Sequence, residues 1–179
     1  RKSALLGGFH FLQFADTDAY ENSNGVVDCF DDETCVKPDD FLKFNGDRVL
    51  VADLKTRNYF CSDKITVPVC FSNLGEDIEK RANLTLTVEK DGKTYVDCSM
   101  KNVDISRKGS YRLCKARITL PKESGVYALK LRLGTKNGVY SENEWTLWLY
   151  EKPSEKETYK EFVSYARGDT AITDDIGKA

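Results

Sequence analysis

The feature that most constrains this chain is a series of short segments, between residues 48 and 150, in which apolar and polar residues alternate. In residues 64–72, for example, Ile65, Val67, Val69 and Phe71 are separated by smaller or polar residues. Successive side chains of a β-strand point to opposite faces, so such a segment buries one face. Seven segments read as strands, at residues 48–54, 64–72, 83–90, 93–98, 110–120, 126–133 and 144–150.

The segments are separated by residues that favour turns. Asp91-Gly92 is a tight-turn pair and predicts a hairpin between the third and fourth segments. Pro68 lacks a backbone N–H, so we expect it at a sheet edge or a bulge. Seven or eight short strands without helical periodicity predict a mainly β fold, namely a two-sheet β-sandwich of immunoglobulin or fibronectin type.

The flanking residues have a different pattern. Residues 7–16, G-G-F-H-F-L-Q-F-A-D, read as an apolar strand with polar interruptions. A short helix is predicted where Pro38 can occupy the first position, two aspartates follow, and Gly46 ends the segment. A charged linker begins near residue 152. The sequence therefore divides into residues 1–47, a sandwich at 48–151, and residues 152–179 as a linker and the start of a further domain.

Composition and motifs exclude several classes of function. The 27 basic and 29 acidic residues are interspersed, which argues against nucleic-acid binding. No apolar run approaches the roughly 18 residues that span a bilayer, so no membrane partner is predicted. The glycine-rich motifs that bind phosphate groups, G-x-G-x-x-G and G-x-x-x-x-G-K-[ST], do not occur in the sequence, and we predict no cofactor. Six cysteines without a C-x-x-C pair, together with one histidine, predict unpaired thiols and no metal site.

Catalytic constellations are equally scarce. Only His10 could serve as the base of a nucleophilic triad, and most acidic residues occupy turns or outward strand positions. Trp145 and Trp148 are three residues apart in one strand and so point to opposite faces. One of them is expected in the core, and the other is either a docking residue or a platform on which a sugar stacks.

Four stretches in order resemble the C-terminal part of glycoside hydrolase family 2, which includes β-galactosidases, β-glucuronidases and β-mannosidases. They are G-G-F-H-F-L-Q-F-A-D, G-V-V-D-C-F, K-P-D-D-F-L-K-F-N and the closing N-E-W-T-L-W-L-Y. The closing stretch supplies Asn143, Trp145, Trp148 and Tyr150 in the family's Asn-x-Trp-x-x-Trp-x-Tyr pattern. The resemblance implies that residues 1–47 are the last strand, loop and helix of a (β/α)8 catalytic barrel, followed by an immunoglobulin-like domain.

The resemblance also implies what this chain does not contain. The two catalytic glutamates of these retaining enzymes belong to barrel strands that precede the first residue here, so we expect this chain alone to be inactive and assign no catalytic residue. Phe11, Gln13, Asp16 and, more weakly, His10 would line the sugar pocket of the full-length enzyme. Phe11 stands where many relatives carry a tryptophan. The implied partners are a carbohydrate substrate and the barrel itself, and we expect the isolated chain to have negligible sugar affinity.

Two other hypotheses stay open. The sandwich could be a carbohydrate-binding module, which a line of exposed aromatic rings on one face would favour, or an interaction domain of ordinary immunoglobulin type. An apolar patch contacted by residues 1–47 would instead favour the hydrolase hypothesis. The compartment also stays open between periplasmic or secreted bacterial and cytoplasmic, because unpaired thiols favour a reducing environment whereas such relatives are often exported.

Overall fold

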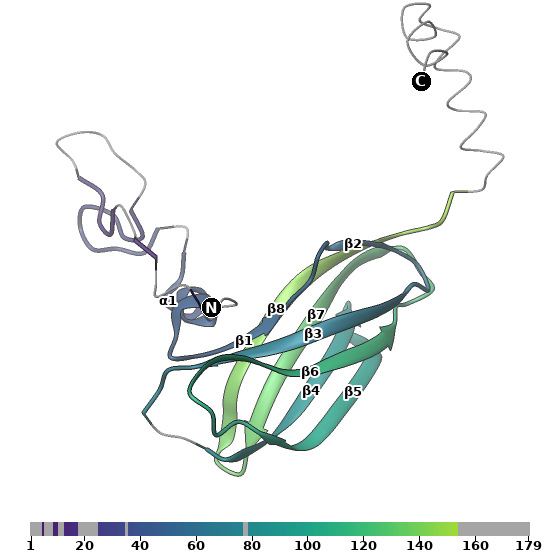
Figure 1. The fold of residues 1–179 in the computed structure, drawn as a ribbon. Coiled ribbons are helices and arrows are strands. Elements are labelled where there is room, and N and C mark those ends of the chain that lie inside the picture. Colours follow the sequence, from purple (N-terminus) through teal and green to yellow (C-terminus); the bar gives the residue numbers. More distant parts are fainter. Residues whose placement is uncertain are drawn as a thin grey trace, which may run out of the picture.

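The computed structural model describes residues 5, 9–10, 13–17, 25–34, 36–76 and 79–153. One short helix precedes eight strands (Figure 1). In chain order they are α1 (Pro38–Asn45), β1 (Arg48–Ala52), β2 (Asn58–Phe60), β3 (Lys64–Asn73), β4 (Arg81–Lys90), β5 (Lys93–Asp104), β6 (Gly109–Thr119), β7 (Gly125–Thr135) and β8 (Gly138–Tyr150). All seven predicted strands and the predicted helix are present.

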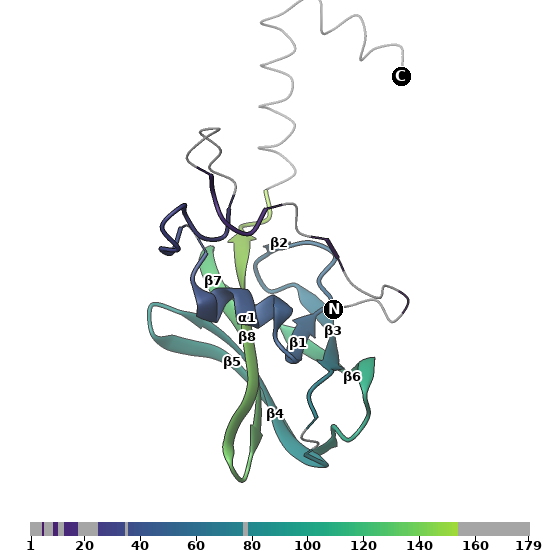
Figure 2. The ribbon, with the colours of Figure 1, turned by 90° about the vertical axis from the view of Figure 1, so that its left-hand side faces the viewer.

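The strands form two sheets. One sheet has the order β1-β3-β6 and is antiparallel, and the other has the order β2-β8-β7-β4-β5. Within the second sheet only β2 runs parallel to its neighbour, β8. The two sheets face each other across a shared apolar core (Figures 1 and 2). The chain is therefore mainly β, as its alternating pattern predicts.

The core takes side chains from both sheets in the predicted alternation. Phe71 of β3 is fully buried and packs edge-on against Tyr111 of β6, with ring centroids 6.1 Å apart. Tyr127 of β7 is also buried and donates its hydroxyl hydrogen to the carbonyl oxygen of Glu123 at 2.9 Å. Each buried aliphatic or aromatic side chain stabilises the fold by about 1.5–3 kcal/mol relative to exposure. The other large buried side chains include Leu50, Val67, Val69, Leu84, Leu86, Val88, Leu129, Leu131, Leu133, Leu147 and Leu149.

The hairpin between β4 and β5 turns at the predicted pair. Asp91 and Gly92 have φ values of 51° and 75°, which a type I′ turn requires. Gly92 adopts this conformation without steric cost, and a short aspartate tolerates it. The turn places Lys90 opposite Lys93 and fixes the register of β4 against β5.

Pro68 lies beside one of the two environments predicted for it, a bulge, and not in an edge strand. It belongs to β3, the central strand of its sheet, and directly precedes the register irregularity of β3 against β6 at Val69 and Cys70. β1 ends at Ala52, opposite Val69, and the carbonyl oxygen of Pro68 accepts a hydrogen bond from Asp53 at 2.9 Å. The N–H and C=O groups of one residue point to the same side in an antiparallel strand. The donor that proline lacks would therefore face the end of β1, so the ladder with β6 loses nothing.

The predicted strand at residues 7–16 does not form a ladder in its described part, residues 9–10 and 13–17. Ala15 makes an isolated parallel bridge to Val27, and the carbonyl oxygen of Phe14 accepts hydrogen bonds from Val26 and Val27 at 2.8 and 3.1 Å. This contact spans too few residues to sustain a regular strand. Residues 7, 8, 11 and 12 lie outside the described residues.

Within the part of the chain that the structure describes, no helix has the length and apolar character needed to cross a membrane.

Candidate functional site

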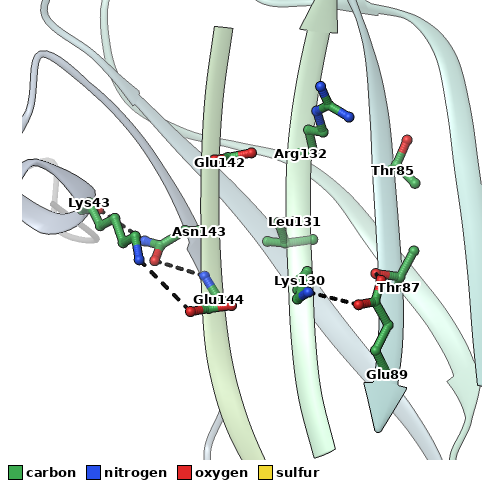
Figure 3. A pocket seen from close by; sticks show the side chains of 10 residues that line it. All are labelled: Lys43, Thr85, Thr87, Glu89, Lys130, Leu131, Arg132, Glu142, Asn143 and Glu144. Atoms are coloured by element: carbon green, nitrogen blue, oxygen red, sulfur yellow. Dashed lines mark hydrogen bonds and ion pairs between the residues drawn. The ribbon is translucent and has the colours of Figure 1, made fainter. Parts of the chain in front are cut away.

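A hollow of about 530 Å³ lies on the outer face of the five-stranded sheet, beside α1 (Figure 3). Alternation along the strands positions its lining, because the residues between the buried leucines of β4 and β7 point outward. Lys43 reaches the hollow from α1. The strands supply Thr85, Thr87 and Glu89 from β4, Lys130, Leu131 and Arg132 from β7, and Glu142, Asn143 and Glu144 from β8.

Opposite charges in the hollow are mostly paired. Lys130 Nζ donates to Glu89 Oε2 at 2.7 Å, and Thr87 Oγ1 donates to Glu89 Oε1 at 2.8 Å. These hydrogen bonds from Lys130 and Thr87 lower the pKa of Glu89, and the same pair raises the pKa of Lys130. Lys43 Nζ lies 2.9 Å from Asp40 Oδ1. It also lies 3.8 Å from Glu144 Oε1 (Figure 3).

This electrostatic arrangement suits hydrogen bonding and not proton transfer. A general acid at neutral pH needs a carboxyl group whose pKa is raised, whereas the pKa of Glu89 is lowered. The side chain of Arg132 makes no hydrogen bond or ion pair with a described residue, so its guanidinium is available to a ligand. The described residues contain no cluster of three or more side chains that could hold a metal ion.

Asn143 connects three elements at one end of the hollow. Its Nδ2 donates to the carbonyl oxygen of Lys43 in α1 and to that of Leu50 in β1, both at 3.0 Å. Its Oδ1 accepts the backbone N–H of Glu144 at 2.9 Å. One amide therefore ties α1 to β1 and β8, the two strands that run past the helix in Figure 2.

The predicted pocket residues lie away from this hollow. Asp16 is half-buried, and its Oδ1 accepts the backbone N–H of Gly25 at 2.6 Å. A Cβ added at Gly25 would stand only 2.5 Å from the backbone nitrogen of Asp16, so this close approach requires glycine. Gln13 is half-buried and His10 is exposed, whereas Phe11 lies outside the described residues. The described contacts of Asp16 hold a loop, and its predicted role toward a sugar stays a prediction.

Three aromatic side chains stand exposed on the outer face of the same sheet, where β2 pairs with the last residues of β8. Phe60, Trp148 and Tyr150 have exposed fractions of 42%, 37% and 52%, and we call them the aromatic row. Phe60 in β2 pairs with Tyr150 in β8, and Trp148 precedes Tyr150 by two residues on the same face. Trp145 packs against the core from the inner face, so the prediction that the two tryptophans point to opposite faces is confirmed.

Part of this surface was not predicted from the sequence. Residues 58–60 are too short to show an alternating pattern, so neither β2 nor the exposure of Phe60 was predicted. The outward positions of Thr85, Thr87 and Glu89 were predicted. These residues form a hollow together with Lys43 only because α1 packs beside the sheet. The position of α1 cannot be predicted from a local sequence pattern.

Comparison with known proteins gives one family match and distant structural likenesses. Residues 63–151, from the residue before β3 to the residue after β8, match a family described as a domain of unknown function (DUF8488). No curated protein matches the sequence. The family match ends at the predicted boundary of the sandwich and does not include α1 or β1.

Three solved structures show partial similarity. The sporulation control protein Spo0M of Bacillus subtilis is 16% identical, with a TM-score of 0.45, over 60% of this chain and 51% of that one. The chain thus spans about half the length of Spo0M. A CARDB domain from Pyrococcus furiosus, solved with di-metal ions, is 12% identical with a TM-score of 0.43, over 59% of this chain and 92% of that one. A superoxide reductase (neelaredoxin) from Ignicoccus hospitalis is 13% identical with a TM-score of 0.34, over 57% and 80%.

Proposed function

We propose that the two-sheet domain is a non-catalytic accessory domain of a bacterial glycoside hydrolase, and that residues 1–47 are the end of the catalytic barrel that precedes it. The observation that carries the proposal is the attachment of α1 to the sandwich through Asn143. Asn143 opens the closing pattern by which the chain resembles family 2 hydrolases. A motif residue that holds a helix of the preceding segment is suited to joining a barrel to the domain that follows.

The strand order supports an immunoglobulin type for this domain. In that fold the sheets contain strands A-B-E and G-F-C, with C′ added beside C in some members. The order β1-β3-β6 corresponds to A-B-E, and β8-β7-β4-β5 corresponds to G-F-C-C′. The first strand is divided between the sheets, with β1 antiparallel to β3 and β2 parallel to β8.

The exposed apolar side chains before the sandwich also support the proposal. Helix α1 has no buried residue, and Leu42 and Phe44 are exposed. Phe14 and Phe30 are exposed as well, although they lie close to the backbone pairings of Val27 with Ala15 and with Glu33. Where such side chains form a contiguous surface, they mark a contact with another part of a protein. A preceding barrel would provide that contact.

Enzyme assays on two lengths of the protein test the proposal. We expect no hydrolysis of nitrophenyl β-galactoside, β-glucuronide or β-mannoside by the 179-residue chain, because the resemblance assigns no catalytic residue to it and the pKa of Glu89 in the hollow is lowered. We expect hydrolysis of one of them by the longer protein encoded by the same gene. Turnover by the short chain, or a gene without a barrel and two glutamates upstream, would refute the proposal.

A further inference from the structure

The aromatic row is held in place by the backbone around it. The N–H of Phe60 donates to Asp63 Oδ2 at 3.0 Å, and Asp63 Oδ1 lies 3.2 Å from Lys152 Nζ. This hydrogen bond from Phe60 is the main cause that lowers the pKa of Asp63. The N–H of Trp148 donates to the carbonyl oxygen of Arg57 at 2.9 Å. The rings are thus exposed from a sheet edge whose backbone is fixed, and not from a loose loop.

The aromatic row continues into the hollow along one face of β8. The outward residues of β8, in order, are Glu142, Glu144, Thr146, Trp148 and Tyr150. Their neighbours on β7 are Arg132, Lys130, Ala128 and Val126, which oppose the first four. From Glu142 to Tyr150 this track measures about 26 Å at the usual rise of about 3.3 Å per residue. It is polar at one end and aromatic at the other.

This combination fits a polysaccharide chain better than other ligands. A pyranose ring has a flat face of C–H groups that packs on an aromatic ring, while its hydroxyls need donors and acceptors such as Arg132, Glu142 and Thr85. Charged side chains occupy the two positions of the track farthest from the aromatic row, Lys130 beside Glu144 and Arg132 beside Glu142, whereas the core of a protein interface is depleted of charge. Nucleic acids need a basic surface, and here both signs alternate.

We propose that the outer face of β8, from the aromatic row to the hollow, binds a neutral polysaccharide chain. The aromatic row supplies the stacking platform, and Arg132 and Glu142 hydrogen-bond to hydroxyl groups farther along the chain. This surface revises the expectation of negligible sugar affinity, because a line of exposed aromatic rings favours binding. The inference extends the proposed function, on which it rests for the choice of carbohydrate, by giving the accessory domain a role in holding substrate.

Binding to defined oligosaccharides tests the inference with the 179-residue chain. The probes are cellohexaose, laminarihexaose, mannohexaose and β-1,4-galactan oligosaccharides, measured by isothermal titration calorimetry and by the NMR signal of the Trp148 indole N–H. We expect binding of at least one probe, with a shift of that signal. We expect Trp148→Ala to weaken the affinity at least about tenfold, as loss of a central aromatic contact does, and Arg132→Ala to weaken it less.

Val139→Ala is the matched control, because Val139 is also exposed on β8 but lies near the turn at the opposite end from the aromatic row. Its affinity should equal that of the original chain. Absence of binding to every probe, or unchanged affinity in the double variant Trp148→Ala, Tyr150→Ala, would overturn the inference. Neither result would affect the hydrolase assay on the longer protein, so failure of this inference and failure of the proposed function are distinguishable.

Discussion

The sandwich buries most of its large apolar side chains, whereas the segment before it leaves several of them exposed. Between Val49 and Leu149 the strands bury a continuous core shared by both sheets. In residues 5–47 large apolar side chains stand exposed, including Leu5 at 96% and Phe30 at 81%. The sandwich therefore buries its apolar residues within its own core, whereas the exposed ones before it are those that the proposed barrel would cover.

The same comparison shows how the two regions are joined. Asn143 donates to α1 and to β1, and the ion pair of Lys43 with Glu144 adds a second, weaker contact. Loss of a partly buried amide leaves two carbonyl oxygens without a hydrogen-bond donor, which lowers stability, whereas an exposed ion pair contributes little to stability. The junction should consequently depend on one residue.

The largest expected effect comes from truncating a buried side chain of the sandwich core. Leu129 is fully buried in β7, so Leu129→Ala should lower the free energy of unfolding by about 2–5 kcal/mol through lost burial and a cavity. Urea denaturation followed by tryptophan fluorescence measures the change. Val126→Ala removes an exposed side chain from the same strand and should change stability by less than about 0.5 kcal/mol. Equal losses of unfolding free energy in Leu129→Ala and Val126→Ala would contradict the burial of Leu129 in the core.

Removal of the side-chain amide of Asn143 should weaken the attachment of α1 to the sandwich. Asn143→Ala leaves the carbonyl oxygens of Lys43 and Leu50 without this donor, a loss of about 1–3 kcal/mol. Hydrogen exchange should accelerate in α1 while β4 and β7 keep their protection. Asn137→Ala, in the turn before β8, is the control and should leave α1 unchanged. Unchanged exchange in α1 for Asn143→Ala would show that other contacts hold the helix.

The loop around Asp16 offers a smaller, local test. Gly25→Ala places a Cβ within 2.5 Å of Asp16 N and Val27 O, backbone atoms that cannot yield without breaking their pairing. We expect a local loss of about 1 kcal/mol, seen as faster limited proteolysis before α1 with the sandwich intact. At Gly134 no atom lies within 4 Å of an added Cβ, so Gly134→Ala should leave this cleavage unchanged. Resistance of Gly25→Ala to protease would contradict the described contact.

The smallest expected effect is the pH dependence that comes from Glu89. Its pKa is lowered in the folded chain, so its stabilising contribution is complete above the ordinary value of 4.5 and disappears as the pH falls through the lowered value. Glu89→Gln should cost a few tenths of a kcal/mol at pH 7 and nothing at low pH. Glu142→Gln, which removes an exposed carboxylate of the same hollow, serves as the control. An equal cost at both pH values would exclude the ion pair as the cause.

The sequence predicted most of the sandwich because alternation reports burial directly. Leu84, Leu86 and Val88 are buried as their spacing requires, and the Asp91-Gly92 turn forms where its residue types demand. The short strand β2 was missed, because three residues carry too little pattern and its parallel partner is remote in sequence. For Pro68 the sequence left an edge and a bulge open, and the structure places it next to a bulge in a central strand, where β1 stops.

The candidate site was predictable only in part. The outward direction of Trp148 follows from its spacing to Trp145, but Phe60 joins it only through pairing of β2 with β8. The hollow needs Lys43, which α1 brings to the sheet by a contact of Asn143. Interactions between elements distant in sequence, and not local preferences, therefore decide the site.

The most direct test of the central claim compares hydrogen exchange in the 179-residue chain and in a protein in which the proposed catalytic barrel precedes it. The account predicts that residues 38–45 exchange much faster in the short chain, because the surface that covers Leu42 and Phe44 is missing there. Strands β3, β4 and β7 should exchange alike in both proteins, because their core is complete. Equal protection of residues 38–45 in the two proteins would contradict the assignment of this segment to a preceding domain.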